Sequence, residues 1–190
     1  MMMKMKIYSG VHGLLNPGCV VWISAGDGVS DGVFTVTWNM PVRKEPAMVA
    51  IECSQNHHTY QFIRKTGEFA VNIPEAKQVD AILGCGRVSG KTGVDKYAKF
   101  GLTREKAEKI KAPIIREAFA NIECRVLNVL DMGSSALLIA QAVSTQVDKR
   151  HFVDGKISFD NGLELLHHIT GDQFCVSNKV LIGKVDDAGA

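Results

Sequence analysis

Paired cysteines are missing from this sequence. The five cysteines, Cys19, Cys53, Cys85, Cys124 and Cys175, stand singly, and their number is odd. They form neither a Cys-x-x-Cys motif nor the regular spacing of a disulfide framework, so we expect reduced thiols in a cytoplasmic protein.

A strong net charge and a long apolar run are also absent. The 22 basic and 20 acidic residues leave a net charge of +2, which gives no global field to attract nucleic acid or an anionic membrane. No segment approaches a membrane span, and residues 1–7 lack the apolar stretch of a signal peptide. A hydrophobic content of 46% over 190 residues is enough for one substantial core. We expect one unprocessed domain over residues 1–190 that binds a small ligand.

Alternating and continuous apolar segments predict most of the strands. Within 34–39, Phe34, Val36 and Trp38 are expected to face the core, while Thr35, Thr37 and Asn39 face the other way. Turn residues separate the other segments. The predicted strands cover 19–25, 34–39, 47–53, 69–73, 119–130, 136–147 and 174–177, with 119–147 forming a hairpin.

Short helices are predicted between the strands. Capping residues, prolines and glycines place them at 60–66, 74–83, 103–109 and 161–170, with Gly84 ending the second and 84–95 forming a loop. Strands and helices do not alternate regularly. The sequence therefore predicts a mainly β fold, a closed antiparallel barrel over about 15–178 with a polar tail after 178.

Three polar segments are candidates for ligand binding. Residues 35–39 form either an ordinary half-exposed strand or a polar surface for a planar heteroaromatic ring. Residues 54–59 precede a helix, where free amides and the hydroxyls of Ser54 and Thr59 could bind phosphate, or where Asn56 or Thr59 could cap the helix. Residues 89–97 offer glycines, Ser89, Lys91 and Lys96 to an anion, but lack the complete loop signature of a nucleoside triphosphatase.

Metal binding and nucleophilic catalysis are not predicted. The pairs His57-His58 and His167-His168 have no carboxylate or cysteine at ligand spacing, so solvated or capping histidines are the simpler interpretation. There is no Gly-x-Ser-x-Gly motif, and Cys53 ends an apolar strand face, where it is expected to pack as a small core residue.

Several motifs together resemble those of the flavin reductase family, and in particular its flavoredoxin and ferric reductase branches. Their order and spacing carry the resemblance from about Cys19 to Phe174. The motifs are 34–41 (FTVTWNMP), 47–51 (AMVAI), 58–60 (HTY), 69–74 (FAVNIP), 95–97 (DKY) and 153–156 (VDGK).

The resemblance implies a split β-barrel homodimer of Greek-key type, with FMN near the subunit interface. The flavin ring would lie against the backbone of Thr35, Val36, Thr37, Trp38 and Asn39. The same resemblance places Cys53, Ser54 and Thr59 on the phosphate side of the cofactor, with His58 close by. It also implies that Lys96 approaches the cofactor, that Asn72 braces the site and that the aromatic Phe174 lies near the flavin.

One departure from the family pattern concerns the electron donor. Many relatives have Gly-Asp-His just before the second hairpin strand, where this chain has Gly133-Ser134-Ser135. A flavin oxidoreductase using NADH or NADPH, a flavoredoxin-type electron carrier served by a redox protein partner, and a flavin-binding module without turnover therefore remain as alternatives. In each, the flavin would carry the chemistry, and no protein acid or base is expected to be indispensable.

Overall fold

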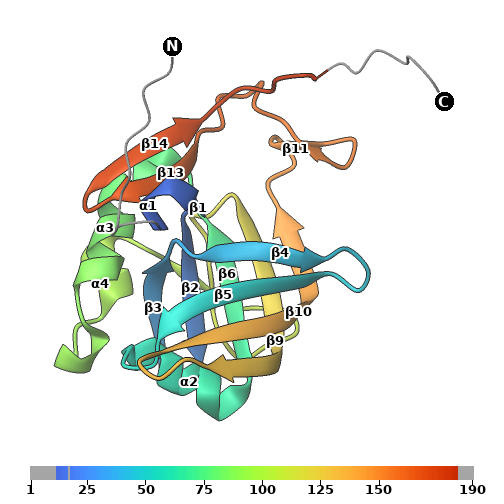
Figure 1. Cartoon of the computed structure of the whole chain (residues 1–190). Coiled ribbons are helices and arrows are strands. Elements are labelled where there is room, and N and C mark those ends of the chain that lie inside the picture. Colours follow the sequence, from blue (N-terminus) through green and yellow to red (C-terminus); the bar gives the residue numbers. More distant parts are fainter. Residues whose placement is uncertain (1–11, 17, 184–190) are drawn as a thin grey trace.

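The computed structural model describes residues 12–16 and 18–183 (Figure 1). The predicted domain, 1–190, extends past these residues at both ends. Residues 178–183 contain no helix or strand and are exposed, and three of them, Val180, Leu181 and Ile182, are apolar.

Strands outnumber helices in the described chain, and most of them are antiparallel. The helices are α1 (His12–Leu15), α2 (His58–Thr66), η1 (Ala76–Gln78), α3 (Val79–Arg87), η2 (Gly90–Thr92) and α4 (Lys96–Phe100). The strands are β1 (Gly18–Cys19), β2 (Val21–Gly26), β3 (Asp31–Val36), β4 (Asn39–Arg43), β5 (Met48–Ser54), β6 (Glu68–Ile73), β7 (Arg104–Glu105), β8 (Ile114–Ile115), β9 (Ala120–Asp131), β10 (Ser135–Val147), β11 (Phe152–Val153), β12 (Lys156–Ile157), β13 (Leu165–Thr170) and β14 (Gln173–Ser177).

Seven strands form one antiparallel sheet in the order β3-β2-β6-β9-β10-β5-β4. Its two edge strands, β3 and β4, are consecutive in sequence and are separated only by Thr37 and Trp38. The sheet must therefore curl until its edges are neighbours, which makes it a barrel (Figure 1). The prediction of a mainly β split barrel is confirmed.

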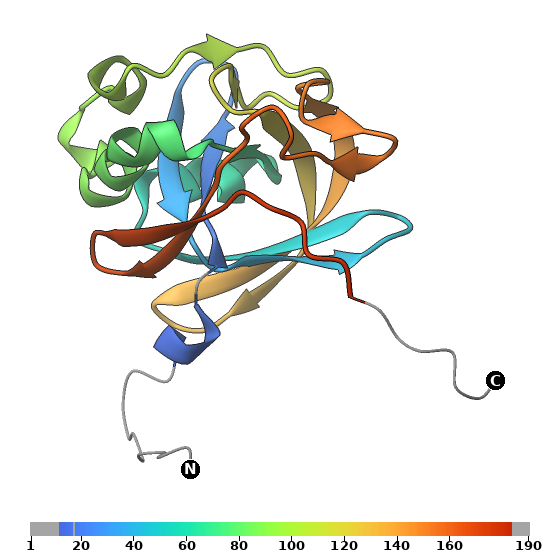
Figure 2. The same cartoon turned by 90° about the horizontal axis from the view of Figure 1, so that it is seen from above.

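Two apolar cores lie on opposite sides of the sheet. The barrel interior is filled by alternate residues of its strands, among them Phe34, Ile51 and Phe69. On the outer face of β2 and β3, Trp22 packs with side chains of α3 and α4, including Tyr97. These helices gather on one side of the barrel, as Figure 2 shows from above, and they hold the loop after α3 beside the end of β3.

Two predicted helices are wrong. Residues 161–170 contain β13, which pairs with β1 and β14; Asn161 donates to the Arg150 carbonyl and caps no helix. Residues 103–109 contain β7 and bends, because the Glu123 carboxylate accepts hydrogen bonds from the backbone N–H groups of Glu108 and Lys109. In both places a tertiary contact overrides a local pattern.

The segment between Pro74 and Phe100 also differs from its prediction. Helix α3 does not stop at Gly84 but runs to Arg87, and α4 follows where no helix was predicted before Thr103. Gly84 has a packing role, because the ring of Phe100 occupies the space that a Cβ at this position would need. The glycine therefore joins α3 to α4 and does not end a helix.

Candidate functional site

The predicted strand 34–39 is broken at the point where the chain crosses between the sheet edges. The Trp38 carbonyl accepts a hydrogen bond from Glu52 N–H at 2.9 Å. Among the described residues, none accepts a hydrogen bond from the backbone N–H of Thr37 or of Trp38. Thr37 is half-buried and Trp38 is exposed, so both N–H groups are open to an external acceptor, either a ligand or water.

A cavity of about 120 Å³ lies beside this break. Its lining brings together four predicted residues of the first segment with the predicted Cys53 and Ser54: Thr35, Val36, Thr37, Trp38, Cys53 and Ser54, with Glu52 and His57 added. Segments far apart in sequence are thus assembled as expected from the motifs.

The side chains of the broken strand are less available than its backbone. Thr35 Oγ1 donates to the Ile82 carbonyl at 2.6 Å, and Asn39 Nδ2 donates to the Cys19 carbonyl at 2.7 Å. Both predicted polar residues therefore hold neighbouring elements in place. Trp38 was predicted to face the core with Phe34 and Val36, but it is 48% exposed because the alternation ends with β3.

Helix α2 begins without a side-chain cap. Its N-cap is His57, whose side chain makes no capping hydrogen bond, so the alternative in which Asn56 or Thr59 caps the helix is wrong. Within the described chain, the N–H groups of His58 and Thr59 have no hydrogen-bond acceptor. Free amides in the first turn of a helix stabilise an anion.

A second cavity, of about 130 Å³, lies between this helix start and the loop after α3. The predicted His58, Thr59, Ser89 and Lys96 line it. Its other lining residues are Phe34, Asn56, His57, Cys85, Gly86, Arg87, Val88 and Gly90.

Glycine allows the loop to approach the helix. A Cβ on Gly90 would lie 3.0 Å from His58 Cδ2, and one on Gly32 would lie 2.6 Å from Thr59 Oγ1. Lys91 is exposed and does not line this cavity, whereas Arg87 does, and sequence reasoning missed Arg87. Its position next to the predicted Ser89 was the only available signal.

Lys96 is buried, with 7% of its surface exposed. Its Nζ donates to the Val33 carbonyl at 2.9 Å and to the Cys85 carbonyl at 2.7 Å, which ties β3 to α3. Burial lowers the pKa of this amine. An ammonium group has three donors, so one N–H remains for a ligand in the cavities that Lys96 lines.

His57 stands where the two cavities meet, and it was not predicted as a site residue. It lines both cavities, and its ring packs edge-on against Phe34 with the centroids 4.7 Å apart. Burial is the largest cause that lowers its pKa, followed by the charge of Lys96; Glu52 opposes them. His57 is therefore expected to be neutral near pH 7.

Asn72 and Phe174 do not line these cavities. Asn72 is fully buried, donating to Ser24 Oγ at 2.9 Å and accepting from Ile115 N–H at 2.9 Å and Asn121 Nδ2 at 2.8 Å, so it braces the barrel itself. Phe174 lies on β14 against the ring of His168, on the outer core.

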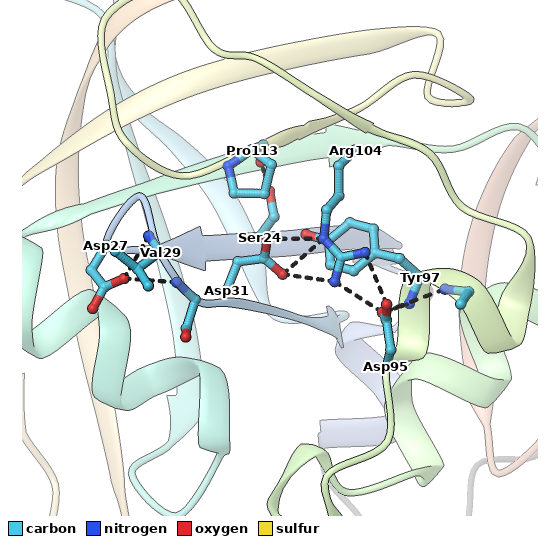
Figure 3. Close-up of polar contacts among 10 residues, drawn as sticks. Ser24, Asp27, Val29, Asp31, Asp95, Tyr97, Arg104 and Pro113 are labelled. Carbon is cyan, nitrogen blue, oxygen red and sulfur yellow. Dashed lines mark hydrogen bonds and ion pairs between the residues drawn. The ribbon is translucent and has the colours of Figure 1, made fainter.

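A larger cavity of about 530 Å³ adjoins the second one, with which it shares His58, Thr59, Gly90 and Lys96. At its border, Arg104 forms ion pairs with Asp31 and Asp95, both at 2.9 Å, and its guanidinium stacks 3.9 Å above the Tyr97 ring (Figure 3). The hydrogen bonds from Arg104 are the largest cause that lowers the pKa of Asp95. The motif 95–97 includes Asp95 and Tyr97, but nothing in the sequence pointed to Asp31 or Arg104.

In the described residues, no helix is long and apolar enough to cross a membrane. What the chain builds is an antiparallel barrel with a break between its edge strands and polar cavities beside that break. This is the architecture of FMN-binding split barrels.

A family model described as "Flavin reductase like domain" matches residues 14–168. The chain belongs to the flavin reductase-like family, as the motifs suggested.

Two curated relatives match most of the chain. The uncharacterized protein YddH of Escherichia coli (strain K12) is 32% identical over 171 residues, covering 87% of this chain and 90% of that protein. The reductase component of 4-nitrophenol 4-monooxygenase/4-nitrocatechol 2-monooxygenase of Rhodococcus opacus is 27% identical over 139 residues, covering 73% and 70%.

Among solved structures, flavoredoxin of Desulfovibrio vulgaris (Miyazaki F) superposes with a TM-score of 0.82 at 22% identity, covering 98% of this chain and 100% of that one. At this level of identity, the likeness establishes the fold alone.

Proposed function

We propose that this protein binds FMN at the strand break and acts as a flavin oxidoreductase. The observation that carries the proposal is the pair of free backbone N–H groups at Thr37 and Trp38, beside a cavity that shares the lining residue His57 with the cavity at the uncapped start of α2. A flavin mononucleotide has hydrogen-bond acceptors on its ring edge and a phosphate at its other end. The free N–H groups at the strand break would face the ring edge, and the uncapped start of α2 would face the phosphate.

The side chains around the second cavity suit a phosphate. His58 and Thr59 offer helix amides, Ser89 offers a hydroxyl, and Arg87 and Lys96 supply positive charge. Ser54 lines the neighbouring cavity, and Lys91 is exposed next to Gly90. Arg87 makes no ion pair among the described residues. Arg87 can therefore pair with the phosphate without breaking an existing ion pair.

Bound FMN would supply the transfer of hydride and electrons. The chain's residues would position the ring, bind the phosphate and exclude water from one face of the flavin. Cys53 takes no chemical part in this proposal, because burial raises the pKa of its thiol to about 12 and keeps it protonated.

A flavoredoxin-type carrier is the second candidate function. It is favoured by the turn that replaces Gly-Asp-His, which lies beside the proposed phosphate site: Ser54 Oγ donates to the Ser134 carbonyl at 3.4 Å, and Gln55 Nε2 donates to the Gly133 carbonyl at 3.0 Å. No histidine is present there to meet a nicotinamide. Such a carrier would take electrons from a redox protein.

We propose that the protein forms a homodimer. An apolar surface on β4, β9 and the turn after β9 stays exposed, next to the strand break. Its exposed side chains are Trp38, Met40, Val42, Leu127, Val129, Leu130 and Met132. Large exposed apolar patches mark interaction surfaces. Light scattering coupled to size exclusion should report twice the mass of the 20.7 kDa chain.

Titration of the purified protein with FMN tests the function directly. We expect saturable binding and a perturbed flavin absorbance spectrum, and a protein that takes up no FMN would refute the proposal. Stopped-flow mixing of the loaded protein with NADH and NADPH then separates the candidates. Rapid bleaching excludes a pure carrier, and turnover with ferric chelates or free flavin excludes a module without turnover.

A further inference from the structure

His57 is the one described residue that lines both cavities of the proposed FMN site. The first cavity lies at the strand break, and the second lies at the uncapped start of α2. We propose that the imidazole of His57 takes up a proton when the phosphate of FMN binds, so that FMN is held more tightly as the pH falls. His57 thereby adds a charge to the site of the proposed function, on which this inference rests.

The ring of His57 has one nitrogen that a ligand can reach. Nδ1 is buried and has no hydrogen-bond partner in the described chain. Nε2 also makes no hydrogen bond to a described residue, but it is not among the buried unpaired atoms, so it is accessible from outside the protein. The edge-on contact with the Phe34 ring, at 4.7 Å between centroids, holds the imidazole in place.

Cations outnumber anions around this ring. The charged side chains that line the cavities or act on His57 from nearby are Glu52 on β5, Arg87 on α3, Lys91 on η2 and Lys96 on α4. The thiols of Cys53 and Cys85 stay protonated, because burial raises the pKa of each to about 12. The other titratable group is His58, the next residue in the chain, which also lines the second cavity.

Charge at the second cavity already acts on the imidazole. Burial is the largest cause that lowers the pKa of His57, and the charge of Lys96, which lines that cavity, comes next. A phosphate monoester carries about 1.5 to 2 negative charges at pH 7. In the same cavity it acts in the opposite direction to Lys96, and a nearby opposite charge changes a pKa by about 1 to 3. Bound FMN therefore raises the pKa of His57.

The direction of the pH dependence follows from these two states. In the free protein the pKa of His57 is lowered, so the imidazole is neutral near pH 7. In the complex the pKa is higher, so the complex holds a proton that the free protein lacks. The affinity for FMN therefore rises as the pH falls through the pKa of the complex, and the rise ends below the pKa of the free protein.

The experiment measures FMN and riboflavin binding to the full chain by calorimetry at about pH 6 and about pH 8. The buffers contain no phosphate and differ in their enthalpy of ionisation, so that the measured binding enthalpy gives the number of protons taken up. His57→Asn removes the titrating group. His151→Asn is the matched control, because the ring of His151 also packs edge-on against a phenylalanine, its Nδ1 is also buried without a partner, and it lines neither cavity.

We expect the ratio of FMN affinity between the wild type and His57→Asn to rise by about threefold to tenfold from pH 8 to pH 6. At about pH 6 the wild type should also take up about half a proton or more in excess of His57→Asn. The phosphate of FMN itself titrates near pH 6 in every chain, so the difference between chains reports His57. The ratio between the wild type and His151→Asn should not change with pH, and riboflavin, which lacks the phosphate, should show no pH-dependent ratio.

Two results overturn the inference. If FMN binds to the wild type and to His57→Asn with the same pH dependence and the same proton uptake, proton uptake at His57 is refuted while the proposed function stands. If riboflavin shows the same pH-dependent ratio as FMN, the phosphate is not the cause. If FMN binds at neither pH, the proposed function and the inference fail together.

Discussion

Lys96→Met tests two roles of Lys96 separately, its contribution to the stability of the fold and its contribution to FMN binding. The buried ammonium makes two hydrogen bonds, to the carbonyls of Val33 and Cys85. Each hydrogen bond to a charged group contributes about 1.5 to 3 kcal/mol. Methionine fills similar space without the cost of burying a charge, and the freed carbonyls border cavities where water can reach them.

The net loss of stability is therefore expected to be about 2 to 4 kcal/mol, less than the sum of the two bonds. For a chain of this size, this corresponds to a fall in Tm of roughly 5 to 15 °C. Lys99→Met is the control, because Lys99 lies exposed on the same helix. If the free energies of unfolding of Lys96→Met and Lys99→Met, measured by thermal unfolding, agree within about 0.5 kcal/mol, Lys96 has no structural role.

The ligand role of Lys96 is tested with the same variants. If its third N–H reaches the phosphate, FMN affinity should fall about tenfold in Lys96→Met, whereas riboflavin, which lacks the phosphate, should bind as before. Thr59→Ala in the same chain should add to the loss for FMN. Equal losses for FMN and riboflavin would show that Lys96 acts only through the fold.

Other consequences concern single groups. His57 should titrate below pH 6.5 by NMR, and because its folded pKa is lowered, the wild type should lose stability relative to His57→Asn as the pH falls from about 6.5 through that pKa. Asp95 has a lowered pKa, so the advantage of wild type over Asp95→Asn in chemical denaturation should be present above pH 4 and vanish as the pH falls through the folded pKa. Asn72→Leu leaves buried partners unpaired and should cost about 3 kcal/mol or more, yet FMN affinity at low temperature should stay within twofold. Gly32→Ala should weaken FMN binding, because the new Cβ would lie 2.6 Å from Thr59 Oγ1. Gly13→Ala, whose new Cβ would meet nothing within 4 Å, is the control.

Local patterns predicted the barrel strands well because the apolar residues of those strands either alternate with polar ones or form a continuous run. The hairpin of β9 and β10, with its turn at 131–134, follows its prediction closely. The helix predicted at 161–170 failed because a capping pair and a terminal glycine say nothing about distant partners. The pairing of β13 with β1, more than a hundred residues away in sequence, decided that segment.

The site divides in the same way. Contiguous motifs located Thr35–Trp38, Cys53, Ser54, His58 and Thr59, which the fold brings to two cavities that share His57 in their lining. His57 and Arg104 were missed, because their positions depend on elements that meet only in the folded chain. Asn72 was predicted to brace the site, and it instead ties β6 to β2, β8 and β9 on the outer face of the sheet.

The strand break links the fold to the proposed function. A sheet that closes through its own chain must leave the ladder of one edge before joining the other, and the residues in between lose their partners. Here those residues are Thr37 and Trp38, and the side chains around them, Thr35 and Asn39, are already engaged in holding α3 and β1. The backbone donors of Thr37 and Trp38 are left for a ligand at this point. A binding site made of backbone depends on the geometry of closure more than on side-chain identity, so variants at Thr37 that keep the barrel intact should retain FMN.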